Sequence, residues 1–125
     1  MITLTLFHPH QSVPPQSWTF EEETIVRIGR ATDNHIVLYS AVVSRYHVEL
    51  RQVETGWKIV NIGTNGTYVD DQSITQVPAT DGTIFRLARS GPQMLVGFSN
   101  QKQKPGIKTN IEEIGYKSFT PKKVN

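Results

Sequence analysis

Apolar and polar residues alternate with a period of two along much of the first hundred positions. The alternation occupies residues 2–6, 18–20, 48–51, 57–59 and 94–98, and short apolar runs occupy residues 25–28, 36–38 and 84–87. A period of two is the repeat of a β-strand, because successive side chains point to opposite faces of a sheet. The pattern therefore predicts a series of short strands, and it predicts no helix before residue 99.

Turn-forming residues separate these predicted strands. Clusters rich in Asp, Asn, Gly and Ser recur at intervals of about 8 to 12 residues, which is typical of a sandwich or barrel. The clusters are residues 32–34, 54–56, 65–66, 70–71, 81–82 and 90–92. We therefore expect an all-β fold, an antiparallel two-sheet β-sandwich of about 10–11 strands.

The pattern divides the chain into a domain over residues 1–99 and a basic tail over residues 100–125. The tail loses the strand periodicity and holds six lysines and two glutamates, a net charge of +4, whereas residues 1–99 carry −2. We expect this segment to be a flexible tail or linker, because basic runs are usually solvated. A helical turn over residues 110–114 would suit Asn110 as its N-cap.

Several classes of function are excluded by what the chain lacks. The sequence has no cysteine, so it forms neither a disulfide nor a thiolate metal site. It carries no nucleophile elbow, no zinc-protease motif and no phosphate-binding Gly-Lys-Ser/Thr loop. His8 and His10 share a strand face but have no third ligand nearby. We therefore predict a non-enzymatic protein without metal or cofactor and, since its start does not read as a signal peptide, a cytoplasmic one.

Polar residues of a different kind gather at three predicted turns. Singly, an arginine after a strand is usually solvated, a serine caps a turn and a histidine is structural. An Asn-Gly pair is by itself the strongest short-range signal for a β-hairpin. The three groups are Gly29-Arg30, Ser44-Arg45-Tyr46-His47 and Thr64-Asn65-Gly66-Thr67.

Together these groups resemble the forkhead-associated (FHA) domain family over about residues 2–98. The family pattern is Gly-Arg, then Ser-x-x-His about 14 residues later, then Asn-Gly about 20 residues further. This chain has Gly29-Arg30, Ser44-x-x-His47 and Asn65-Gly66 at those spacings. The run Asp-Asn-His-Ile-Val-Leu over residues 33–38 and Trp57 agree with the family as well.

The resemblance implies a module that binds phosphothreonine in partner proteins. A phosphate monoester carries about −1.5 to −2 charges and three acceptor oxygens, so its reader needs a cation and convergent donors. Arg30 would supply a fork of donors, Ser44 a hydroxyl and a loop amide, and Arg45 and Thr64 further donors. The side-chain amide of Asn65 would bind the peptide backbone just after the phosphothreonine.

The remaining motif residues are expected to support this site. The resemblance implies that His47 braces the loop that carries Ser44, rather than touching phosphate. Gly29 and Gly66 would provide backbone freedom that a Cβ would obstruct.

One departure from the family concerns the loop before Asn65. The family commonly reads Asp-Leu-Gly-Ser-Thr-Asn-Gly-Thr, whereas residues 61–67 here read Asn-Ile-Gly-Thr-Asn-Gly-Thr, one residue shorter. Thr64 thus matches either of two family positions.

Two alternatives stay open: an FHA-type scaffold that binds a partner by a sheet face without phosphate, and nucleic-acid contact through the basic tail. The sequence predicts no small-molecule substrate and no membrane contact, and it does not identify the partner or the kinase.

Overall fold

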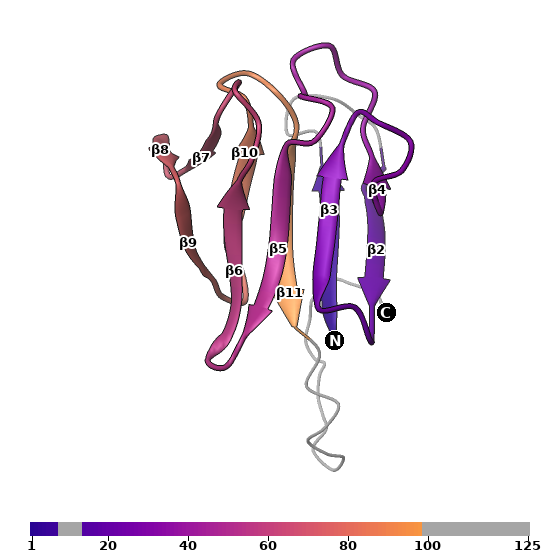
Figure 1. The fold of residues 1–125 in the computed structure, drawn as a ribbon, viewed down its shortest axis with the longest axis vertical. Coiled ribbons are helices and arrows are strands. Elements are labelled where there is room, and N and C mark those ends of the chain that lie inside the picture. Colours follow the sequence, from indigo (N-terminus) through magenta and orange to yellow (C-terminus); the bar gives the residue numbers. More distant parts are fainter. Residues whose placement is uncertain (8–13, 99–125) are drawn as a thin grey trace.

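The computed structural model of the chain describes residues 1–7 and 14–98, which form eleven strands and no helix (Figure 1). The strands build two sheets packed face to face, which confirms the predicted β-sandwich. No helix within these residues could cross a membrane. The predicted tail and the helical turn near Asn110 lie outside the described residues.

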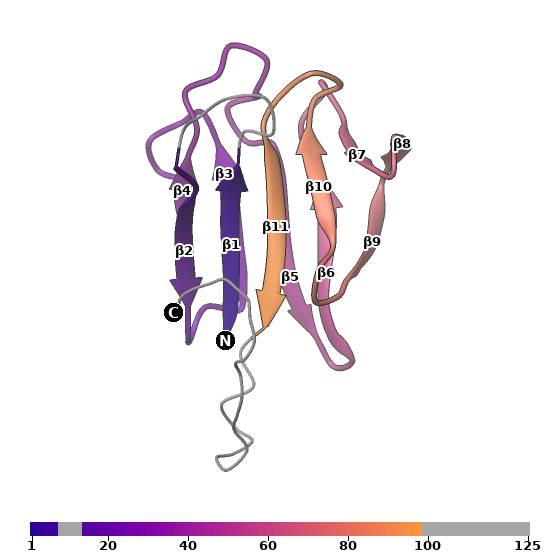
Figure 2. The same cartoon turned by 180° about the vertical axis from the view of Figure 1, so that it is seen from behind.

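One sheet has six strands in the order β2-β1-β11-β10-β7-β8, and every pair of adjacent strands in it is antiparallel (Figure 2). Its strands are β1 (Ile2–Phe7), β2 (Gln16–Phe20), β7 (Thr67–Val69), β8 (Gln72–Ile74), β10 (Ile84–Leu87) and β11 (Gln93–Phe98).

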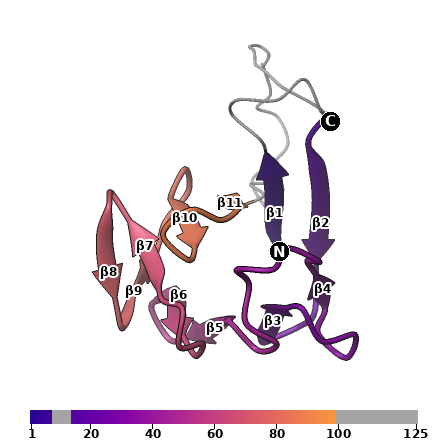
Figure 3. The ribbon, with the colours of Figure 1, turned by 90° about the horizontal axis from the view of Figure 1, so that it is seen from above.

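The second sheet has five strands in the order β4-β3-β5-β6-β9. Its strands are β3 (Ile25–Gly29), β4 (Ile36–Val37), β5 (Val48–Val53), β6 (Gly56–Asn61) and β9 (Gln76–Ala79). The short β4 runs parallel to β3, and the other pairs of this sheet are antiparallel. Seen along the strands, the two sheets form two layers (Figure 3).

The core lies between the layers and is built from the alternating positions that the sequence marks. Leu4 pairs with Val96 in one sheet, and Leu50 pairs with Ile59 in the other, and all four side chains are buried. Phe85 is fully buried among them. Each such side chain contributes about 1.5 to 3 kcal/mol of hydrophobic stabilisation, so the packed layers support the loops at their ends in a chain that has no cysteine for a disulfide.

The sequence pattern missed three short strands, β7, β8 and β9. They have three or four residues each, too few for a period of two to stand out. Pro78 also argues against β9, since proline cannot donate to a ladder. It is tolerated because β9 is the edge strand of its sheet.

Two Asx-rich turns differ in role. Asp70 and Asp71 have φ of 52° and 62° and join β7 to β8 as a two-residue hairpin, the geometry of a type I′ turn. The loop that holds Asn65-Gly66 instead connects β6 and β7, which belong to different sheets. The hairpin interpretation of Asn65-Gly66 is therefore wrong, and this loop crosses from one layer to the other.

The connections fall into two groups at opposite ends of the sandwich. The loops after β3, β4, β6 and β10 gather at the end drawn uppermost in Figure 1, which we call the loop end. The connections after β2, β5 and β9 lie at the other end, which we call the turn end. The three polar groups of the sequence motif all fall in or beside the loops of the loop end.

Candidate functional site

The β3–β4 loop and the β4–β5 loop are joined by backbone hydrogen bonds. Arg30 donates its N–H to the carbonyl of Ser44 at 3.0 Å, and Ala31 donates to the carbonyl of Arg45 at 3.1 Å. These bonds hold the two loops together just beyond the ends of β3 and β5. Arg30 and Ser44, 14 positions apart in the sequence, are therefore held side by side.

Gly29 is required where these two loops approach. A Cβ at Gly29 would overlap the backbone carbonyl of Arg45 and would lie 2.9 Å from the Nδ2 of Asn34. Because backbone atoms cannot move aside as a flexible side chain can, no larger residue fits here. The predicted supporting role of Gly29 thus has a steric basis, namely close approach and not a left-handed conformation.

Arg30 is anchored at one point and open at the rest of its guanidinium. Its Nε donates to the carbonyl of Val43 at 3.0 Å, and the residue is exposed. Its two terminal nitrogens bond no other described residue. The anchor fixes the direction of the side chain, so the terminal nitrogens keep their donors in a set orientation.

His47 is fully buried and joins two loops through both ring nitrogens. The N–H of Ser44 donates to Nδ1 at 2.9 Å, so Nδ1 carries no proton. Nε2 therefore carries the proton and donates to the carbonyl of Gly66 at 2.7 Å. The ring connects the β4–β5 loop with the β6–β7 loop, as expected of a brace.

Burial lowers the pKa of His47 below its usual value, and the hydrogen bond to the Gly66 carbonyl offsets part of that effect. His47 is therefore neutral near pH 7. Protonation of Nδ1 would also set two donors against each other, since the Ser44 N–H already points at that atom.

The β6–β7 loop holds its shape by side chains of the two strand residues that flank it. Asn61 donates to the carbonyl of Gly63 at 3.1 Å and accepts a hydrogen bond from the buried Thr67 hydroxyl at 2.8 Å. A Cβ at Gly63 would lie 2.6 Å from the Oγ of Ser44. The Ser44 side chain thus rests directly on the backbone of this loop.

Asn65 ties the same loop to the β4–β5 loop. Its Nδ2 donates to the carbonyl of Val42 at 2.7 Å, and the residue is exposed. One amide hydrogen and the carbonyl oxygen of Asn65 bond no other described residue. Thr64, the neighbouring residue, is exposed as well.

Gly66 has φ of 85° and its carbonyl accepts two hydrogen bonds, from His47 and from the N–H of Ala88. Positive φ is the conformation in which glycine is favoured over other residues. The predicted role of Gly66 therefore rests on backbone conformation, unlike that of Gly29.

The structure adds supporting residues that the sequence analysis did not single out. Asn34 is buried and donates to the carbonyls of Ala31 and Arg45, at 2.8 and 2.9 Å. The exposed Tyr46 donates its hydroxyl to the carboxylate of Asp33 at 3.0 Å, and this bond raises the pKa of Tyr46. Asn61 belongs to the same group of braces, as does Thr67, which the sequence analysis placed at a turn without giving it a role. A buried asparagine or threonine gives no signal in the sequence, since its burial depends on the packing of distant loops.

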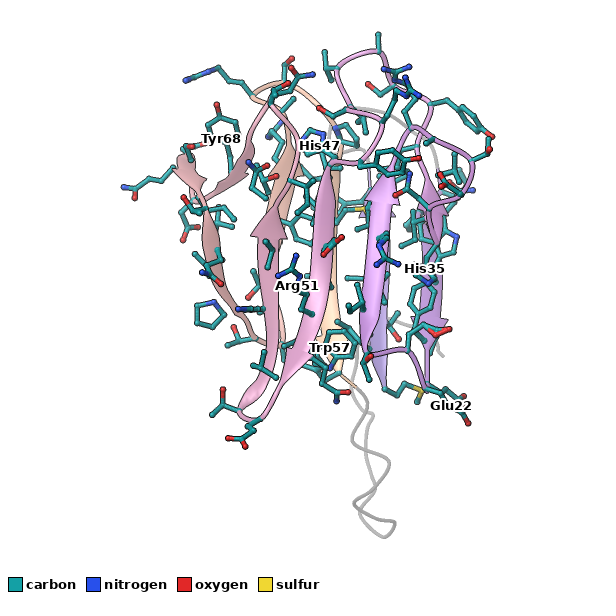
Figure 4. All side chains as sticks on the ribbon, viewed as in Figure 1. Glu22, His35, His47, Arg51, Trp57 and Tyr68 are labelled. Carbon is teal, nitrogen blue, oxygen red and sulfur yellow. The ribbon has the colours of Figure 1, made fainter. Side chains whose placement is uncertain are left out.

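The predicted site residues therefore gather at one end of the sandwich (Figure 4, in which His47 is labelled). One detail differs from expectation, because the N–H of Ser44 is occupied by His47. The next amide, that of Arg45, bonds no other described residue and lies in an exposed position. Of these two amides, only that of Arg45 has no partner among the described residues.

Charge separates the two ends. Arg30, Arg45 and Arg89 are exposed at the loop end and form no ion pair with a described residue. The turn end instead carries Glu21, Glu22, Glu23, Glu54 and Asp81. The described loops of the loop end also hold one acid, Asp33, which accepts from the Tyr46 hydroxyl, so the three arginines leave a net positive charge there that suits an anion. Among the described residues, no group of three His, Cys, Asp or Glu side chains could hold a metal ion.

Comparisons with known proteins agree with this geometry. The family model of the FHA domain matches residues 26–88, half of the chain. No curated protein sequence gives a significant match.

Three solved structures illustrate the similarity. The FhaA FHA domain, in complex with the intracellular domain of another protein, is 26% identical with a TM-score of 0.64, covering 77% of this chain and 99% of that one. An FHA domain from a study of phosphothreonine-dependent FHA domain interactions is 26% identical with a TM-score of 0.62, covering 78% and 96%. Mycobacterium tuberculosis EmbR, in complex with a low-affinity phosphopeptide, is 28% identical with a TM-score of 0.61, covering 78% of this chain and 24% of that longer one.

FHA domains are protein-interaction modules that bind phosphopeptides. The matched residues run from β3 to the start of the β10–β11 loop and so include every motif residue named above. With this match, the sandwich topology and the gathered motif residues, the chain belongs to the FHA domain family.

Proposed function

We propose that this chain binds phosphothreonine in partner proteins, with Arg30, Ser44, Arg45 and Thr64 holding the phosphate and Asn65 holding the peptide backbone. One observation supports it most directly. Hydrogen bonds join the loops whose backbone carries these residues. The terminal nitrogens of Arg30, the N–H of Arg45 and one amide hydrogen of Asn65 bond no other described residue. Such a site is preorganised for an anion, so binding costs little loop ordering.

Arg30 makes the strongest single contact in this proposal. Its terminal nitrogens form a planar fork that matches two phosphate oxygens, and charge-assisted hydrogen bonds of this kind contribute about 1.5 to 3 kcal/mol. Because its Nε is already bonded to the Val43 carbonyl, the side chain has less freedom to lose when phosphate binds.

Neutral donors complete the phosphate site. The Ser44 hydroxyl lies against Gly63, where the β4–β5 loop meets the β6–β7 loop. Because the Ser44 N–H is bonded to His47, the next amide that has no partner among the described residues is that of Arg45. Thr64 follows Gly63 directly and adds a hydroxyl from the β6–β7 loop. The Arg45 side chain adds a second positive charge that attracts a doubly charged phosphate over a neutral hydroxyl.

Asn65 is suited to the peptide backbone because its amide is both donor and acceptor. One of its hydrogens is used on the Val42 carbonyl, which orients the group. The other hydrogen and the oxygen can bond one peptide unit of an extended ligand. Preference for threonine over serine then requires a small apolar site for the methyl group near Asn65. Burial of one such carbon contributes about 0.8 kcal/mol to the binding free energy, judged from its buried area alone.

Matched titrations of one peptide in three forms test this function. The peptide carries phosphothreonine, phosphoserine or threonine at the same position, and calorimetry measures each affinity. We expect tight binding of the phosphothreonine form, at least fourfold weaker binding of the phosphoserine form on the area argument, and no detectable binding of the threonine form.

Each other outcome has a definite meaning. Equal affinity for the threonine form would overturn phosphate recognition and favour a scaffold that binds by a sheet face. Equal affinity for the phosphoserine form would show that the methyl site does not exist and that the chain binds phosphopeptides without distinguishing threonine from serine.

A further inference from the structure

The described sandwich has four edge strands, and each edge presents backbone groups that can pair with another strand. They are β2 and β8 in the six-stranded sheet and β4 and β9 in the five-stranded sheet. Along an antiparallel edge strand, every second residue turns both its N–H and its C=O away from the neighbouring strand. Proteins commonly blunt such edges with short strands, proline or charged side chains, because an open edge invites association.

Three of these four edges are blunted. β4 has two residues, β8 has three, and β9 contains Pro78. β2 has five residues, Gln16–Phe20, with no charged residue, proline or glycine among them. All five pair with β1 in one continuous register, and β2 is the outermost strand of its sheet (Figure 2). Within the described residues, β2 thus presents the one edge that is long, regular and uncharged.

β2 carries different residues on its two faces. Ser17 and Thr19 are exposed on the outer face of the sheet, where their hydroxyls bond to those of Thr5 and Thr3 at 2.8 and 2.9 Å. Trp18, between them, points the other way and is partly buried against the core. The order hydroxyl, tryptophan, hydroxyl reads the same in both directions along the strand. β2 is therefore complementary to a second copy of itself.

We propose that two copies of this chain associate through β2, which pairs antiparallel with β2 of the second copy about Trp18. This arrangement places Thr19 of each copy opposite Ser17 of the other, so the row of hydroxyls continues across the pair. The two indole rings meet at the centre. Aromatic pairs and hydroxyl pairs both stabilise neighbouring strands, and tryptophan is enriched among the central residues that dominate binding energy in interfaces.

Charge favours the antiparallel over the parallel arrangement. β2 is followed at once by Glu21, Glu22 and Glu23, all exposed. Parallel pairing would set the two runs of glutamate side by side, where like charges repel. Antiparallel pairing separates them by the length of the strand, about 17 Å for five residues. That is twice the Debye length of about 8 Å at physiological ionic strength, so salt screens the remaining repulsion.

The association is expected to be weak and reversible. A pair of five-residue strands covers little surface, whereas specific, stable interfaces bury more than about 1,200 Å². We therefore expect a dissociation constant of about 0.1 to 1 mM. Because the paired strands run in opposite directions, the loop ends of the two copies lie at opposite ends of the dimer. On the proposed function, the dimer would join two phosphorylated partner chains.

Sedimentation of the full chain, with no peptide present, tests the pairing. The weight-average mass should be close to that of a monomer at about 10 μM and should rise toward twice that value at about 1 mM. A Trp57→Phe variant keeps Trp18 as its only tryptophan. Its fluorescence emission should shift to shorter wavelength over the same concentration range, because the indole ring loses water in the dimer.

Charges placed at Gln16 test the direction of the strands. In the antiparallel pair, Gln16 lies opposite Phe20 of the second copy and next to its Glu21. Gln16→Lys should tighten the association about two- to thirtyfold and Gln16→Glu should loosen it by a similar factor, since the two-fold axis makes each exposed contact twice. Both effects should shrink as salt is raised.

The matched controls are Gln72→Lys and Gln72→Glu. Gln72 is exposed and begins β8, the other edge strand of the same sheet, just as Gln16 begins β2. These variants add the same charges to the chain and should leave the association unchanged. A melting curve of each variant shows that it folds.

Each outcome decides for or against the pairing. A chain that stays monomeric at about 1 mM overturns it, whether the edge is open or is covered by another segment of the same chain. Loosening by both Gln16 variants indicates parallel strands, and equal responses at Gln16 and Gln72 place the contact elsewhere. Either result, or a constant Trp18 emission, also overturns it. No phosphopeptide enters these measurements, so their failure leaves phosphate recognition standing, and failure of the peptide titrations leaves the pairing standing.

Discussion

The loop end and the turn end belong to the same sandwich but are built on different rules. The loops after β3, β4, β6 and β10 contain five to ten residues, whereas the connections at the turn end contain two to four. Arginines are exposed at the first and glutamates at the second, including Glu22 (Figure 4). The same sheets lead to both ends, so the sheets alone do not explain why the ends differ in loop length and in exposed charge.

The difference lies in how each end holds its shape. The short turns are held by bonds within the turn and to a neighbouring strand, as in the bond from the Thr83 N–H to the Thr80 carbonyl at 3.0 Å and the bond from the Phe98 N–H to the Asp81 carboxylate at 2.8 Å. The long loops hold one another instead, through His47, Asn65 and Asn34. A rigid binding surface therefore arises from cross-links between loops, and changes at the loop end should cost more than equivalent changes at the turn end.

The largest expected effect comes from an alanine at Gly29. Its Cβ would overlap the Arg45 backbone, so we expect Gly29→Ala to destabilise the fold by more than about 3 kcal/mol or to prevent folding. The turn-end counterpart, Gly82→Ala, has open space around it and pays only for its φ of 93°, about 1 to 2 kcal/mol. Urea unfolding of both variants measures the contrast. Equal losses would show that loop packing at Gly29 is looser than described.

His47→Ala should cost about 2 to 4 kcal/mol of unfolding free energy, because it leaves the Ser44 N–H without its acceptor and opens a cavity. Phosphopeptide affinity should fall with it. The control is His35→Ala, which removes an exposed ring that accepts one backbone N–H, from Arg27, and should cost less than about 1.5 kcal/mol. If affinity fell while the melting temperature stayed, His47 would contact the ligand directly.

Arg30→Ala should weaken phosphopeptide binding by about 1.5 to 3 kcal/mol, roughly 10- to 150-fold, through loss of the charge-assisted fork. Arg30→Lys should recover only part of this, since an ammonium cannot bond two oxygens in one plane. Arg51→Ala, on the sheet face, should bind as the wild type does. Calorimetry with one phosphothreonine peptide compares all three, and unchanged affinity in Arg30→Ala would contradict the proposed site.

Acidification should weaken the loop end. The folded state holds the pKa of His47 below its unfolded value near 6.5, so the unfolded chain binds the proton more readily. The stabilisation from neutral His47 is complete above about pH 6.5 and is lost as pH falls through the folded pKa. Unfolding free energy measured between pH 8 and 5 should therefore decline, and His47→Gln should decline less. Parallel curves for the two proteins would exclude His47 as the cause.

The smallest expected effect is from the tail. A chain that ends at Gln101 should fold and bind the phosphothreonine peptide as the full chain does, because the last strand ends at Phe98, at the turn end and away from the site. A melting curve and a titration of the shortened chain check this. Loss of stability would place the domain boundary later than residue 99.

Much of the fold could be predicted because the sandwich depends on local patterning. Alternation in residues 2–6 and 94–98 identifies β1 and β11, and their buried residues face each other across the pair. The edge strand β9, which contains Pro78, carries no such pattern, and the short apolar run over residues 36–38 predicts β4 but not its parallel pairing with β3. Their pairing follows from which strands remain available once the longer ones have formed the sheets.

The candidate site was identified by residue type and spacing, and the structure supplies the contacts. Arg30, Ser44, His47 and Asn65 could be named because their combination resembles a family pattern. That His47 holds its proton on Nε2, or that Asn65 bonds Val42, could not be read from the sequence. Asn34 and Asn61 were missed, and Thr67 was given no role, for the same reason, since their partners depend on how the loops pack.

By itself, the sequence determined the strand periodicity, the turn positions and the residue types available to a phosphate reader. The tertiary structure decided which of these residues meet. His47 and Gly66 are 19 positions apart, and Asn65 and Val42 are 23 apart. No local preference brings such pairs together, because their contact depends on two sheets packing first and holding the ends of four loops at one place.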